Sequence, residues 1–204
     1  MNHTTQAATA GRSAEASARG RARDRVFQVA SDLFRREGIR AVGVDTIVKT
    51  AGVAKISLYR NFESKDELIV AYLSEMNTSY WANVDHCLAK SDRSPRSQLR
   101  AYMAYIAESA TTPGYRGCPF INYSAEFPDP SHPGHRVAEA NRIEMRSRLL
   151  QWTKAMKAAH PAKLADSLLL LIDGAYASRQ TLGGSRGPAV ALVWAADALI
   201  AGAT

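Results

Sequence analysis

Residues 44–73, VDTIVKTAGVAKISLYRNFESKDELIVAYL, contain the pattern that decides the fold. Apolar residues recur at helical spacing on both sides of Gly52, a residue type that adopts the left-handed backbone of a tight turn without strain. Two short helices joined in this way form a helix-turn-helix, whose second helix enters the major groove of DNA with its N-terminal end first. We therefore predict helices over 43–51 and 54–61, joined at 51–53.

The spacing within the second helix sorts its residues into an inner and an outer face. Leu58 and Phe62 are four residues apart and are predicted to face the core. Ile56 and Ser57 lie in the first turn, where an aliphatic group can meet a thymine methyl and a hydroxyl can bond to either kind of base. The residues with donors suited to phosphates are Tyr59, Arg60, Asn61 and Lys65.

The pattern stays helical on both sides of this unit. An apolar stripe from Val26 to Phe34 predicts a helix that ends at Gly38, and a capping box from Ser64 to Glu67 opens a long helix. Further helices are predicted over 99–111, 136–159, 163–182 and 188–201. The predicted fold class is all-α: an N-terminal three-helix head with a helix-turn-helix, joined by a long bridging helix to a C-terminal helical body.

Charge is distributed unevenly along the 204 residues, whose formal net charge is +7. Residues 1–65 hold 12 Lys and Arg against 6 Asp and Glu, whereas residues 66–204 hold 14 against 13. This asymmetry favours an N-terminal part that meets a polyanion, the alternative being a basic segment without a function. We expect a flexible basic arm over 1–21, a DNA-binding domain over 22–66 and an effector-binding and dimerisation domain over 67–204. Arg19, Arg21, Arg23 and Arg25 could enter the minor groove or track phosphates, the alternative being a role in solubility alone.

Residues 22–75 resemble the head of the tetracycline-repressor (TetR) family. The residues that carry the resemblance are Phe34, Gly38, Ile47, Ala51, Gly52, Val53, Leu58, Tyr59, Phe62, Lys65 and Leu68. The resemblance implies base-edge contacts for Lys55, Ile56 and Ser57 and phosphate contacts for Tyr59, Asn61 and Lys65, with Arg60 at a variable position. Ala54 and Gly43 depart from the family pattern, because a hydroxyl residue usually caps the helix at each of these positions.

The resemblance also implies that the body forms a homodimer through its last two long helices. These helices are rich in apolar and small residues, more than a monomer of this size readily hides. A monomeric core is the alternative. The residues predicted at the interface are Leu168, Leu171, Ile172, Ala175, Val190, Val193, Ala196 and Ile200.

By the same resemblance, the body holds a pocket for a small, mostly apolar effector of unknown identity. Aromatic side chains with polar tips and adaptable methionines are typical linings of such a site, although a plain hydrophobic core uses the same residue types. The candidates are Trp81, Tyr102, Met103, Tyr105, Phe120, Tyr123, Phe127, Trp152 and Met156.

Two local features suggest other chemistry. Cys118 lies near Arg116, and a neighbouring cation or a helix N-terminus would lower its thiol pKa, so Cys118 is either a redox or electrophile sensor or a small buried residue at a helix start. Glu126, Asp129, His132 and His135 have a spacing that resembles a metal-ligand set, but the prolines among them prevent a helix that would bring them together, and no metal site is predicted.

The function predicted from these features is a homodimeric, sequence-specific transcriptional regulator, a repressor released from a palindromic double-stranded DNA operator by a small molecule. A constitutive regulator or a thiol sensor using Cys118 is the alternative. No catalytic constellation or cofactor motif indicates an enzyme. Two cysteines and the lack of a secretory signal or of an apolar segment of about 20 residues favour a cytoplasmic protein without a membrane span.

Overall fold

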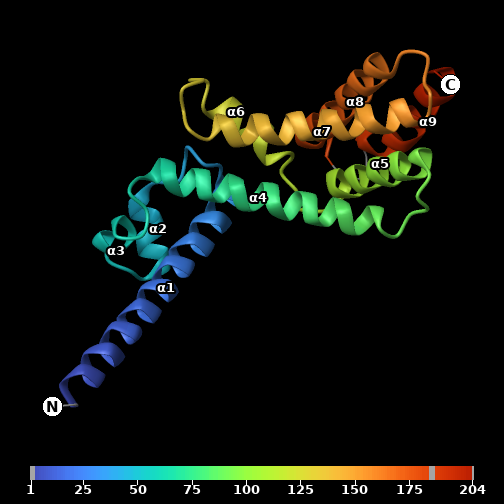
Figure 1. Cartoon of the computed structure of the whole chain (residues 1–204). Coiled ribbons are helices and arrows are strands. Elements are labelled where there is room, and N and C mark those ends of the chain that lie inside the picture. The colour runs from blue at the N-terminus through green and yellow to red at the C-terminus, as the bar shows by residue number, and fades with distance from the viewer. Residues whose placement is uncertain (1–2, 184–186, 204) are drawn as a thin grey trace. The chain divides into compact units, whose positions relative to one another are not determined.

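The computed structural model describes residues 3–183 and 187–203, with side chains from Gly20 onward (Figure 1). The helices are α1 (His3–Glu37), α2 (Val44–Ala51), α3 (Lys55–Tyr59), α4 (Lys65–Leu88), α5 (Pro95–Thr111), α6 (Pro119–Glu126), α7 (His135–Ala155), α8 (Pro161–Leu182) and α9 (Leu192–Ala203), with a 3-10 helix, η1 (Pro188–Ala191). No strand occurs in this described part, so the predicted all-α fold is confirmed. No described helix is long and apolar enough to cross a membrane.

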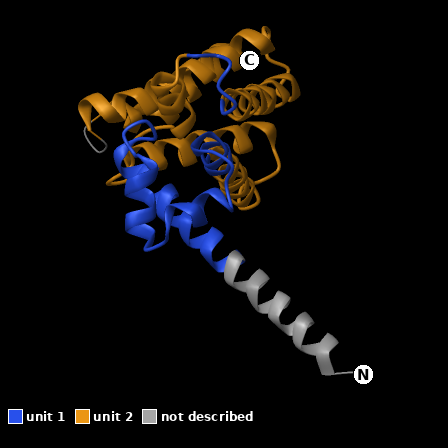
Figure 2. Cartoon of the chain, turned by 90° about the vertical axis from the view of Figure 1, so that its left-hand side faces the viewer, with its two compact units in different colours: residues 1–72, 129–134 blue, residues 73–128, 135–204 orange. Residues whose placement is uncertain are grey.

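The chain divides into two compact units (Figure 2). One unit comprises residues 1–72 together with 129–134, and the other comprises 73–128 and 135–204. In the first unit, α1 packs against α2 and contributes Val26 and Phe34 to a core that also contains Ile47. The ring of Phe34 meets that of Tyr72 edge-on, with centroids 5.4 Å apart. Burying these large side chains is the main force that holds so small a unit together.

The start of α1 differs from the expectation. The structure continues this helix back to His3, whereas a flexible arm was expected over 1–21. This segment contains no proline and is rich in alanine and arginine, which are among the best helix formers and so favour a helical backbone. The side chain of Arg19 lies outside the described residues.

The first turn of α4 is capped by Ser64, as predicted. The Ser64 Oγ accepts a hydrogen bond from the Glu67 N–H at 3.1 Å. The Glu67 carboxylate accepts from the Glu63 N–H, one residue before the position that a capping box uses. The predicted long helix is present, since α4 runs for 24 residues.

A loop from late in the sequence belongs to the first unit. Residues 129–134 join α6 to α7, and His132 places its Nε2 at 3.3 Å from the Asp66 Oδ1. The His132 Nδ1 accepts from the Gly134 N–H at 3.3 Å, so the ring contacts both its own loop and Asp66. His135 instead bonds to the Phe127 carbonyl at 2.7 Å, so the two histidines serve separate local contacts.

The second unit is built around α8. Helices α7 and α9 pack along α8, and α5 contacts all three. The buried side chains include Leu99, Met103, Ile106, Leu149, Leu164, Leu168 and Ile172. Helix α6 was not predicted, although proline at its first position is a helix-start signal. The last predicted helix begins as the 3-10 turn η1.

We expect His132→Ala to loosen the loop over 129–134. Removing the imidazole takes away its contact with Asp66 and the acceptor of the Gly134 N–H, a loss of about 1 kcal/mol, so amide hydrogen exchange in this loop should accelerate about fivefold. His132→Gln, which keeps an N–H donor, is the matched control and should retain most of the protection. Equal exchange in the wild type and in His132→Ala would contradict the role given to this contact.

Candidate functional site

The turn between α2 and α3 has the geometry of a helix-turn-helix. Gly52 lies in the left-handed region, at φ 63° and ψ 39°. The Val53 N–H donates to the Val48 carbonyl at 3.1 Å, which closes the end of α2. Ile47 and Leu58, one from each helix, are both fully buried, so the two helices share one core.

The outer face of α3 carries side chains that protrude into solvent. Ile56 is 61% exposed and Tyr59 is 46% exposed, although both are large and could pack inside a core. Lys55 and Arg60 are also exposed, and Ser57 is half-buried. Tyr59 therefore lies on the surface, and the alternative of a partly buried core aromatic is not what the structure shows.

The side chains of Asn61 and Lys65 form hydrogen bonds with backbone carbonyls of the head. The Asn61 Nδ2 donates to the Ser57 carbonyl at 2.7 Å. The Lys65 Nζ donates to the Ile39 carbonyl at 2.9 Å and so fastens the start of α4 to the segment after α1. Both side chains are half-buried, and their phosphate contacts stay predictions.

Lys55 is held by a carboxylate of the neighbouring helix. Its Nζ lies 2.8 Å from the Asp45 Oδ1. The hydrogen bond to Asp45, together with the attraction of that charge, raises the pKa of Lys55 above its ordinary value. Lys55 is therefore a cation paired with Asp45 at the N-terminal end of α3.

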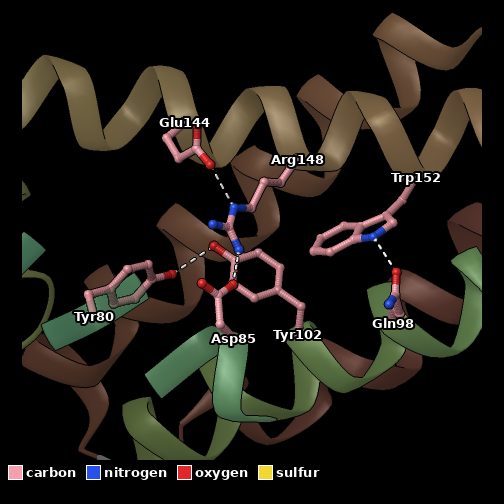
Figure 3. A network of polar contacts seen from close by, with 7 residues as sticks. All are labelled: Tyr80, Asp85, Gln98, Tyr102, Glu144, Arg148 and Trp152. Carbon is pink, nitrogen blue, oxygen red and sulfur yellow. Dashed lines mark hydrogen bonds and ion pairs between the residues drawn. The ribbon is translucent and has the colours of Figure 1, made fainter. Parts of the chain in front are cut away.

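The second unit contains a network of polar side chains between helices (Figure 3). The Tyr80 and Tyr102 hydroxyls are 2.7 Å apart, and burial raises the pKa of both phenols. Arg148 forms ion pairs with Glu144, at 2.7 Å, and with Asp85, and its guanidinium lies 4.3 Å from the Trp81 ring centroid.

The predicted effector residues are only partly brought together. Trp152 contacts Tyr102 at a centroid distance of 5.5 Å and donates its Nε1–H to the Gln98 Oε1 at 3.1 Å. Tyr80 contacts Trp81 and Tyr105, at 4.9 and 6.0 Å between centroids. The other predicted residues are Met103, Phe120 and Tyr123, which are buried, and Phe127 and Met156, which are half-buried. Tyr123 and Phe127 stack on each other at 5.1 Å.

Sequence reasoning missed a buried amide on α7. Asn141 is fully buried, and its Nδ2 donates to the Asn77 Oδ1 at 2.9 Å. The Asn141 Oδ1 and the Trp81 Nε1 are buried without a hydrogen-bond partner among the described residues. Since buried polar groups are normally paired, these two atoms suit a bound molecule that has hydrogen-bonding groups. Asn77 and Trp81 are four residues apart and so lie on the same face of α4. This spacing is the sequence signal that could have indicated a polar site on that face.

Cys118 is not the activated thiol that its sequence neighbours suggested. It is 4% exposed, and burial raises the pKa of the thiol above its ordinary value. The N–H groups of Phe120 and Ile121 favour the thiolate but do not offset this effect. Burial therefore favours the protonated thiol, which is the less reactive form, and the sensor role stays a hypothesis.

Most of the predicted dimer residues are covered by the chain itself. The buried ones are Leu168, Ile172, Ala175, Ala196 and Ile200, and Leu171 and Val193 are half-buried. Of the eight, Val190 is exposed, at 60%. The large apolar side chains that protrude from α8 and α9 are Leu170, 72% exposed, Leu182, 63% exposed, Trp194, 75% exposed, and Leu199, 38% exposed.

The comparisons with known proteins all point to one family of transcriptional regulators. Residues 26–72 match the family model described as bacterial regulatory proteins, tetR family. The crystal structure of SCO4454, a TetR-family transcriptional regulator from Streptomyces coelicolor, is 31% identical, with a TM-score of 0.83 over 89% of this chain and 95% of that one.

Two further relatives give the same result. A putative TetR transcriptional regulator from Streptomyces avermitilis is 32% identical, with a TM-score of 0.78 over 89% of this chain and 97% of that one. The uncharacterized regulator YxaF of Bacillus subtilis is 31% identical over 47% of this chain and 48% of its own length. The match to YxaF therefore spans about half of that protein's length.

We expect Gly52→Ala to destabilise the head. A Cβ in the left-handed region costs about 1 kcal/mol, so the free energy of unfolding measured in urea should fall by that amount. Gly20→Ala is the matched control, because Gly20 is helical with open space around a Cβ, and it should not lower stability. Equal stability of the two variants would contradict the strain assigned to position 52.

Proposed function

The chain belongs to the TetR family of transcriptional regulators, and we propose that it is a homodimeric repressor that a small molecule releases from a palindromic operator. As a member of this family it is a DNA-binding regulator and not an enzyme. The observation that carries the proposal is the surface of α3, the second helix of the helix-turn-helix, from which the large side chains of Ile56 and Tyr59 protrude into solvent. We propose that it acts in the cytoplasm, where it can bind chromosomal DNA.

The contacts with DNA divide into two kinds. Lys55, Ile56 and Ser57 face base edges in the major groove, because they occupy the N-terminal end of α3. Tyr59 and Arg60 are exposed one turn later and bind phosphates, which fix the position of the protein on the duplex. The DNA-binding domain in this proposal covers residues 22–66, and the effector-binding and dimerisation domain covers 67–204.

The dimer interface lies on α8 and α9. Leu170 and Trp194 are large apolar side chains that are mostly exposed, and Val190 is exposed beside α9 in sequence. A second copy of the chain could cover them through a two-fold arrangement, which is also the symmetry that a palindromic operator demands.

The effector binds among the polar side chains of the second unit. The unpartnered Trp81 Nε1–H can donate a hydrogen bond, and the unpartnered Asn141 Oδ1 can accept one. The effector therefore carries both an acceptor and a donor. Arg142 and Arg148 are already paired with Asp173 and Asp85, which favours an uncharged molecule. This refines the expectation of a mostly apolar effector. Binding would release DNA by favouring a state of the dimer in which the two heads no longer match the operator.

Ile56→Ala should weaken operator binding because it removes an apolar contact with a thymine methyl. Loss of about 1 kcal/mol corresponds to about fivefold weaker binding in a fluorescence-anisotropy titration, with little change on scrambled DNA. Deoxyuridine in place of the contacted thymine should weaken the wild type similarly and add nothing in the variant. Ile143→Ala, at another exposed isoleucine, is the control. Additive losses from Ile56→Ala and deoxyuridine would refute the contact.

Trp194→Asp should dissociate the dimer, because a charge cannot be buried unpaired at an apolar interface. Sedimentation equilibrium should show monomers, and operator affinity should fall at least tenfold, since one head alone reads half of the site. Ile143→Asp places the same charge at an exposed position of α7 and should leave the dimer intact. A Trp194→Asp variant that stays dimeric would exclude this face as the interface.

A further inference from the structure

An exposed ion pair joins the N-terminal turns of α2 and α3. Asp45 is the second residue of α2 and Lys55 is the first residue of α3, with 2.8 Å between Nζ and Oδ1. The two side chains are 82% and 53% exposed, respectively. Ion pairs this exposed contribute little to the stability of a fold. The consequence of this pair is instead that it biases the position of the Lys55 ammonium toward Asp45.

Asp45 stands out by its charge. Between Gly38 and Phe62 the sequence has no other acidic residue, whereas the basic residues there are Arg40, Lys49, Lys55 and Arg60. A carboxylate at a surface that meets the phosphate backbone lowers affinity for DNA of every sequence. A cost that applies to all DNA alike can raise discrimination, because discrimination depends on the difference between specific and non-specific binding.

A structural explanation of Asp45 also exists. An acidic residue in the first turn interacts favourably with the positive end of the helix dipole, and Gly43 gives α2 no side-chain cap. This explanation accounts for an acid at position 45 but not for the contact with Lys55. It predicts that removing the charge does not strengthen DNA binding, so the two explanations can be separated.

We propose that Asp45 is a positioning residue for specificity, which keeps Lys55 at the base edges and away from the phosphates. This inference rests on the proposed DNA contacts of α3. An ammonium group has three N–H donors, of which one is held by Asp45 and two remain for acceptors such as the guanine O6 and N7. A contact with phosphate would pull the flexible side chain away from Asp45, so the ion pair opposes the binding mode that carries no sequence information.

The experiment measures the affinity of Asp45→Asn for a scrambled duplex and for the operator at four salt concentrations. Lys55 becomes free to bind phosphate, so affinity for the scrambled duplex should rise about threefold or more and the slope of log K against log salt should steepen by about one. The preference for the operator should fall by a similar factor. Asp32→Asn is the matched control, because Asp32 pairs with Arg35 on α1 and its removal changes the net charge equally.

The same substitution in a Lys55→Ala background tests whether Asp45 acts through Lys55. The slope should then stay that of Lys55→Ala alone. A steeper slope in this background would mean that the carboxylate simply repels DNA, and an unchanged slope in Asp45→Asn alone would leave only the helix-dipole role; either result overturns the proposal. The scrambled duplex needs no operator, so this test remains valid even if the wild type shows no sequence preference, which would count against the proposed function instead.

Discussion

The left-handed backbone at Gly52 is the constraint on which the head depends. It ends α2 and turns the chain so that α3 can bury Leu58 beside Ile47 while Ile56 and Tyr59 remain outside. Because α3 is only five residues long, it has little stability of its own, and its position comes from this shared core. The surface offered to DNA is thus a consequence of packing on the opposite side of the helix.

The second unit is held by a different balance of forces. Its centre is an apolar core around α8, whereas α4 meets its neighbours through polar pairs, namely Tyr80 with Tyr102, Asn77 with Asn141 and Asp85 with Arg148. The Tyr80–Tyr102 and Asn77–Asn141 pairs each contain a fully buried member, and such pairs specify one arrangement, since an unpaired buried group is costly, whereas Asp85 is exposed. A molecule that offers new partners there can therefore change how α4 is held, which is the property that the proposed release from DNA requires.

The sequence was sufficient to predict the helices of the head and the direction of their side chains, because both are determined by residues close together in the chain. The inward direction of Leu58 and Phe62 and the end of α2 at Gly52 follow from spacing within about a dozen residues, and the structure confirms them. The body is different. In the run from Leu168 to Ile172 every face of the helix is apolar, so periodicity could not separate buried Leu168 from exposed Leu170. Cys118 shows the same limit, since its neighbours in sequence suggested activation and its burial in the fold prevents it.

The most direct test of the central claim is a binding titration of the wild-type protein at two salt concentrations. The probes are the DNA that flanks its own coding region and a scrambled duplex of the same length and composition. A regulator of this kind should bind one palindromic stretch at least a thousandfold more tightly than the scrambled duplex, a preference of the order usual for specific DNA-binding proteins, and should keep that preference at the higher salt. Weak binding that is equal on both duplexes and is lost as salt rises would contradict the account, because only the positive charge of the head would then be recognised.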